Sequence, residues 1–166
     1  MNIRHYITIS FFLLSQALYG QDVEKPLTIG QLPPVFHIGE YENLYPELYK
    51  AYPGFLLSVT NNNMNAAFEK WLNMIYAMES HAELLDFDIK GLKIWINVFL
   101  DEKGHIDYFQ YFKKPYSKNI NDKELEAFFK SFIGQFKMEV SAESPFNHSG
   151  SASFPSFGGK PLEANK

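Results

Sequence analysis

The feature that most constrains the fold of this 166-residue chain is a periodic run of large apolar residues between positions 122 and 136. The residues of that run recur at intervals of three and four positions: Leu125, Phe128, Phe129, Phe132, Ile133 and Phe136. Such spacing places their side chains on one face of an α-helix. Asn121 precedes the run as a predicted N-cap, and Glu124 stands where the reciprocal acid of a capping box belongs. The segment therefore predicts an amphipathic helix whose phenylalanine face must lie on a sheet.

Two predicted strands that precede this helix can supply such a sheet. Residues 92–100 alternate between apolar and other side chains, which is typical of a strand with one buried face. Asp101-Glu102-Lys103-Gly104 follows as a turn, with glycine at the left-handed position. Residues 105–112 then return as the second strand of a hairpin. The apolar residues change parity within this strand, which predicts a β-bulge near Tyr108.

Other patterns complete the predicted fold. Apolar spacing predicts a helix over residues 64–80, and Pro46 fits the first turn of a short helix over residues 46–51. One face of this region carries a stripe of tyrosines that we expect to pack on the core: Tyr41, Tyr45, Tyr49 and Tyr52. An irregular strand is expected over residues 149–157. The sequence thus predicts an α+β fold, in which a small antiparallel sheet (a β-hairpin plus a strand after the helix) packs against amphipathic helices.

The N-terminus has the layout of a secretory signal peptide. Arg4 and His5 precede an apolar stretch over residues 6–18, and small residues follow, with Gly20 before the preferred cleavage site. The apolar stretch is shorter than the about 20 residues that span a bilayer, although an uncleaved anchor is the alternative. We therefore expect a signal peptide over 1–20, a tail or linker over 21–33, a domain over 34–157 and a disordered tail over 158–166. Export implies a periplasmic or secreted protein, with membrane attachment only if the signal is retained.

Composition excludes several function classes. The chain has no cysteine, so it can form neither disulfides nor thiolate metal sites and has no thiol nucleophile. Its formal net charge is −4 and Arg4 is its only arginine, which argues against nucleic acid as a partner. The 16 Phe, 10 Tyr and 2 Trp residues are enough to build a core by packing alone.

Polar clusters that could carry chemistry are weak in this sequence. Glu79, His81 and Glu83 lie close in sequence, but spacings of two do not converge on one helical face. His148 and Ser149 would point to opposite faces of a strand, and Asn147-His148-Ser149 matches a glycosylation sequon. We therefore expect a non-catalytic protein without a cofactor or a metal.

Several motifs in a shared order resemble the carboxy-terminal domain of the TonB family of periplasmic energy transducers. The alternating strand and its Asp-x-x-Gly turn are followed by a helix that begins in a similar way and by an apolar-Pro-x-Phe strand. An upstream aromatic helix and a Pro-x-Phe element also match. The matching segments are Pro34–Glu40, Phe68–Leu72, Ile89–Ile106, Asn121–Ala127 and Phe154–Phe157. The resemblance covers residues 34–157 and implies a stand-alone exported relative of that domain.

This resemblance implies a function in protein binding within the bacterial cell envelope. The expected activity is the binding of extended peptide segments of outer-membrane transporters, or of other envelope proteins, by β-strand addition. The expected peptide-binding edge strand contains Ser151, Ser153, Phe154 and Phe157. The alternative is a secreted carbohydrate-binding or hydrolytic protein that uses exposed aromatic residues on the outer sheet face, namely Trp95, Phe99, Phe109 and Tyr111.

Overall fold

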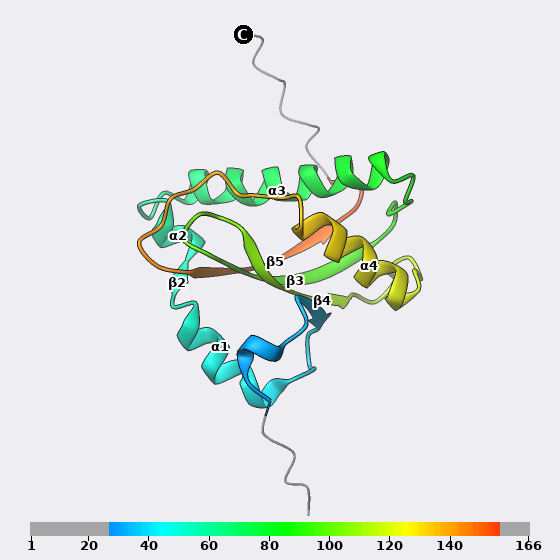
Figure 1. The fold of residues 1–166 in the computed structure, drawn as a ribbon. Helices are drawn as coiled ribbons and strands as arrows, with labels where there is room; N and C mark the ends of the chain where they lie inside the picture. The colour runs from blue at the N-terminus through cyan, green and yellow to red at the C-terminus, as the bar shows by residue number, and fades with distance from the viewer. Residues whose placement is uncertain (1–26, 157–166) are drawn as a thin grey trace, which may run out of the picture.

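A computed structural model describes residues 27–156 of the chain (Figure 1). The predicted signal peptide, residues 21–26 of the predicted tail or linker, and the predicted disordered tail lie outside the described residues. The described elements, in chain order, are two 3₁₀ turns, four α-helices and five strands: η1 Ile29–Gln31, β1 Val35–His37, η2 Glu42–Leu44, α1 Tyr45–Ala51, β2 Gly54–Phe55, α2 Leu56–Val59, α3 Met64–Leu84, β3 Lys93–Leu100, β4 Ile106–Lys113, α4 Asp122–Ile133 and β5 Phe146–Ser153.

The five strands form one sheet in the order β1-β4-β3-β5-β2. The three long central strands are antiparallel neighbours, as the sequence predicts for a hairpin plus a strand after the helix. The two short outer strands, β1 and β2, run parallel to β4 and β5 and were not predicted. They make the sheet mixed, and the fold belongs to the α+β class.

Helices α3 and α4 cover one face of the sheet, which we call the helical face (Figure 1). The predicted phenylalanine stripe of α4 faces the sheet, and the ring of Phe129 lies 4.6 Å from that of Phe109 on β4. On α3, Trp71, Met74 and Met78 join the same buried cluster. Removing these rings and methyl groups from water is the main source of stability for this layer.

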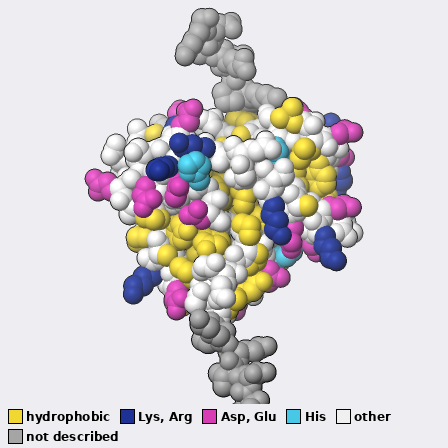
Figure 2. Space-filling view, in the orientation of Figure 1, with side chains coloured by type: hydrophobic (Ala, Val, Ile, Leu, Met, Phe, Trp, Pro, Cys, Tyr) yellow, Lys and Arg dark blue, Asp and Glu magenta, His cyan; other side chains and the backbone are white. Residues whose placement is uncertain are grey.

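The second face of the sheet is covered only in part. Helix α1 and the chain around η1 pack under Phe99 of β3, and Leu48 at the centre of this smaller cluster is fully buried. In Figure 1, α1 lies on the side of the sheet opposite α3. Figure 2 shows that hydrophobic side chains reach the surface around this part of the molecule. Below, we call the side of the sheet that carries α1 the second face.

The predicted helices and strands agree closely with the structure where local signals determine them. Helix α3 extends four residues beyond its predicted end at Ser80, and α4 ends at Ile133 instead of residue 136. The bulge is confirmed: Phe99 pairs with Tyr108 and Leu100 with Ile106, so Asp107 is the extra residue of β4. Gly104 in the turn has a φ of +89°, the left-handed backbone that favours glycine.

One further local prediction was confirmed and two were wrong. The tyrosines of residues 41–52 pack on the core of the second face: Tyr52 is buried, the ring of Tyr49 lies 5.3 Å from that of Phe99, and Tyr41 meets Phe36 edge-on. Leucines at positions 44 and 48 belong to the same cluster. The last strand occupies residues 146–153 and not 149–157, and the segment predicted as a linker contributes the buried Leu32.

Candidate functional site

The edge of the sheet at β5 has a short paired part and a longer open part. β2 pairs only with the first two residues of β5, Phe146 and Asn147. Past Asn147, none of the strands in residues 27–156 lies outside β5. We call the open part, residues 148–153, the β5 edge.

Every second residue of the β5 edge turns its backbone groups outward. The N–H of Phe154 donates to the carbonyl of Leu92 at an N···O distance of 2.9 Å, so the even-numbered residues point toward β3. In an antiparallel ladder the residues between them point away. The outward residues are therefore Ser149, Ser151 and Ser153, and their N–H and C=O groups have no partner among the described residues.

Contacts on both faces of the sheet hold β5 in position. The indole of Trp71 on α3 lies over Gly150 so closely that a Cβ at that position would come within 2.6 Å of its Cζ2 atom. The Asn147 amide donates to the carbonyls of Tyr52 at 2.7 Å and Gly54 at 3.1 Å, which fixes β2 against β5. The edge is thus a fixed template and not a loose segment.

The structure separates the four residues predicted for the binding edge. Ser151 is exposed and Ser153 is half-buried, and both lie on β5. Phe154 follows the strand, and its side chain is only 4% exposed, so it belongs to the core and is not available to a partner. Phe157 lies outside the described residues.

An exposed aromatic pair lies beside the β5 edge on the second face. Trp95 on β3 is directly opposite Phe112 on β4 and Ser151 on β5, and the two aromatic side chains are 47% and 51% exposed. Lys114 lies over the indole, with Nζ 4.9 Å from its ring centroid. Lys93 is exposed and lies opposite Ser153.

The predicted aromatic surface was therefore only partly right. Trp95 belongs to it, but Phe99 is buried beneath α1, and Phe109 and Tyr111 are buried on the helical face. The bulge at Asp107 is the reason, because it moves Phe112, and not Phe109, onto the face of Trp95. The alternation of residues 92–100 together with the predicted bulge is sufficient to place Phe112 on the same face as Trp95.

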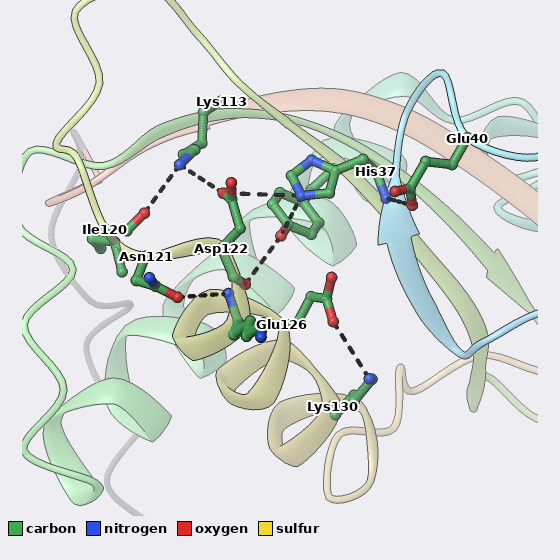
Figure 3. A network of polar contacts seen from close by, with 10 residues as sticks. His37, Glu40, Lys113, Ile120, Asn121, Asp122, Glu126 and Lys130 are labelled. Atoms are coloured by element: carbon green, nitrogen blue, oxygen red, sulfur yellow. Dashed lines mark hydrogen bonds and ion pairs between the residues drawn. The ribbon is translucent and has the colours of Figure 1, made fainter.

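A polar network joins β1, β4 and the start of α4 (Figure 3). Lys113 Nζ lies 2.6 Å from Asp122 Oδ1 and donates to the Ile120 carbonyl, and His37 Nε2 lies 3.0 Å from the Tyr111 hydroxyl. Burial, with the nearby Asp122 carboxylate, raises the pKa of Tyr111, so its hydroxyl stays neutral. Most side chains of the network bind one another or the backbone. We therefore assign the network a structural role, the attachment of the start of α4 to β1 and β4.

The polar clusters considered for chemistry are dispersed in the structure. His81 is buried with its Nε2 atom 3.0 Å from the Ser131 hydroxyl, while Glu79 accepts a bond from the Ser156 hydroxyl. No group of three metal-ligating side chains occurs within residues 27–156. The His148 ring packs on Trp71 and so lies on the face opposite Ser149. The sequon asparagine, Asn147, is buried and inaccessible in the folded chain.

A cleft of about 360 Å³ opens at the end of α3. Apolar residues that include Phe87, Ile89 and Phe154 line it together with four acidic residues, Glu79, Glu83, Asp86 and Asp88. One of these, Asp88, is paired with Lys118 at 2.6 Å, which helps to lower the pKa of that carboxyl. The cleft has an acidic lining but no arrangement of groups that defines a reaction.

Comparison with protein-family models, with curated proteins and with solved structures found no match to this chain. Within the described residues, none of the helices is long and apolar enough to cross a bilayer.

Proposed function

We propose that this chain is a non-catalytic binding module of the cell envelope that adds an extended peptide to its sheet at the β5 edge. The observation that carries the proposal is the row of outward backbone groups at Ser149, Ser151 and Ser153. Unpaired edge groups are templates for another strand, and added strands gain affinity from main-chain hydrogen bonds.

The surroundings of the edge support the same proposal. The three serines that alternate along it have small side chains, so they leave room for a neighbouring strand to approach. β2 already pairs as a parallel strand with the two residues that precede the edge, Phe146 and Asn147, so this side of β5 accepts a neighbouring strand within the fold itself. The resemblance to the TonB family suggests outer-membrane transporter segments as the partners, and the export that residues 1–20 predict would place the edge where such segments occur.

The first experiment titrates the isotope-labelled mature chain with synthetic peptides copied from periplasmic segments of outer-membrane transporters. We expect amide shifts in NMR spectra at Ser149, Ser151 and Ser153, with smaller shifts on β3, the next strand of the sheet. Shifts confined to other parts of the molecule, or no shifts with any peptide, would contradict strand addition.

A backbone-modified peptide separates strand addition from side-chain docking. N-methylation of alternate peptide residues removes the donors on one side of the peptide and leaves its side chains unchanged. We expect binding to be lost for one of the two alternate methylation patterns and retained for the other, because only one side of an added strand faces β5.

Carbohydrate binding is the second candidate, and the exposure of Trp95 next to Phe112 is the observation that favours it. Aromatic rings on a sheet face can stack on sugar rings. Trp71 is 7% exposed, so a change of tryptophan fluorescence on addition of oligosaccharides would report mainly on Trp95. An unchanged spectrum with a panel of oligosaccharides would remove this candidate.

A further inference from the structure

We propose, on the basis of the proposed strand addition, that the peptide bound at the β5 edge carries a large apolar side chain opposite Ser151 and a carboxylate opposite Ser153. These two positions are two residues apart in the peptide, so they share one face of an extended strand. Residues that flank the edge on the second face select these two side chains.

The position opposite Ser151 is bordered by apolar surface. Phe112, Trp95 and Ser151 form one cross-strand row, so a peptide residue opposite Ser151 would continue that row. The peptide backbone would lie about 10 Å from β3, twice the inter-strand spacing. Ser151 is too small to fill the space between, so a long or aromatic peptide side chain can lean over it and contact the exposed indole of Trp95.

The neighbouring row is positively charged. Lys93 lies directly opposite Ser153, and the N–H of Lys114 donates to the Lys93 carbonyl, so both lysines belong to one corner of the second face. Neither ammonium group has a carboxylate partner within residues 27–156, and that of Lys114 lies over the indole of Trp95 instead.

Two adjacent cations without a carboxylate partner, in a chain whose net charge is −4, favour an acidic group on the peptide. A peptide residue opposite Ser153 would face this corner, and opposite charges across strands stabilise a sheet. The apolar row and the basic row together therefore define a pattern of one large apolar residue, one residue of any type and one acid. The order of the apolar residue and the acid depends on the direction in which the peptide runs.

The test uses soluble eight-residue peptides of threonine and serine that differ at two positions only. One peptide carries Phe-Thr-Asp, a second carries the reversed order Asp-Thr-Phe, and two controls replace Phe by Ala or Asp by Lys in whichever order binds better. Affinities for the mature chain are measured by calorimetry, and NMR of the labelled chain confirms that each peptide contacts the β5 edge.

We expect one order to bind more tightly than the other, and its alanine control to lose roughly three- to tenfold in affinity, the range of an aromatic pair. The Trp95→Ala variant should lower the affinity for the phenylalanine peptide by a similar factor and leave that for the alanine control unchanged. In the Lys93→Glu, Lys114→Glu double variant the preference should reverse, so that the lysine control binds better than the aspartate peptide.

The outcomes distinguish this inference from the function on which it rests. If all four peptides bind at the β5 edge with equal affinity in the wild type and both variants, strand addition stands and the specificity proposed here is wrong. If none binds the edge, strand addition itself fails. Circular dichroism of each variant checks that its fold is retained, and Trp95→Phe, which keeps an aromatic ring, provides a milder second substitution.

Discussion

At the scale of single residues, the position of β5 depends on one glycine. Gly150 lies beneath the indole of Trp71, where any Cβ would meet two ring atoms at less than 3 Å. Protein interiors are packed too densely for such an overlap to be absorbed without displacement of the ring or the strand. This single contact therefore couples α3 to the strand that forms the candidate edge.

The first prediction is that Gly150→Ala destabilises the chain by about 1–3 kcal/mol, the usual cost of overpacking. Gly30→Ala is the matched control, because a Cβ at Gly30 would meet no atom within 4 Å. Urea denaturation monitored by circular dichroism gives both free energies of unfolding. Equal values for the two variants would show that the Trp71 contact imposes no such constraint.

His148 makes the second prediction, which concerns pH. Burial against Trp71 lowers the pKa of its imidazole below the ordinary value of 6.5. The unfolded chain therefore binds a proton at a higher pH than the folded chain. The contribution of His148 to stability is complete above pH 6.5 and is lost as the pH falls from there through the folded-state pKa.

The measurement is the free energy of unfolding of the wild type and of His148→Phe between pH 7.5 and 5. We expect the wild type to lose stability over this range more steeply than the variant, which has no imidazole at this position. The carboxyl groups with lowered pKa values, Asp88 and Asp101, titrate in both proteins at lower pH and so do not disturb the comparison. Parallel curves would contradict the role assigned to His148.

At the scale of secondary-structure elements, the sequence predicts those helices and strands whose own residues repeat a local pattern. The spacing of apolar residues is sufficient to find α3, α4 and the hairpin, because each element has several turns or pairs that repeat the same signal. β1 and β2 have three and two residues, too few to show a period, and they exist only through pairing with strands far away in sequence. No local pattern could have predicted them.

The third prediction tests the start of α4, where the sequence predicted a cap. The Asn121 side chain accepts a hydrogen bond from the Lys123 N–H at 2.9 Å, but the Asn121 N–H does not donate to the Glu124 carboxylate, so the predicted capping box is incomplete. We expect Asn121→Ala to cost about 1 kcal/mol of stability, the typical value for a lost N-cap. Asn119→Ala, at an exposed position nearby, should change stability little when measured by thermal unfolding. Similar losses for both would argue against the cap.

At the scale of the whole molecule, the two faces of the sheet divide stability from binding. The helical face buries the phenylalanines of α4 completely, and the second face leaves Trp95 and Phe112 half exposed. The candidate site was predictable in part: the sequence pointed to Ser151 and Ser153. It could not assign Lys93 and Lys114 to the same corner, because that depends on the register between three strands.

The fourth prediction compares two phenylalanines on the two helices of the helical face. Phe129→Ala removes a fully buried ring between α4 and β4, and we expect a loss of about 3–5 kcal/mol. Phe68→Ala removes a ring that is 58% exposed on α3 and should cost far less. Chemical denaturation of both variants measures the difference. A larger loss for Phe68 would contradict the proposed packing of the sheet.

The order of the strands has a consequence for limited proteolysis. One stretch of chain, from β1 through α1 to β2, crosses beneath the sheet and pairs with β4 at one outer edge and with the first two residues of β5 at the other. A single cleavage within this stretch, for instance next to the exposed Lys50, would divide it into two segments. Each segment would then be attached to the sheet by only two or three paired residues. Both ends would then fray. The edge of β4 and the start of β5 would become as open as residues 148–153 already are, and they would pair with the same edges of other nicked molecules, so that cleavage would convert a dispersed protein into fibrous aggregates.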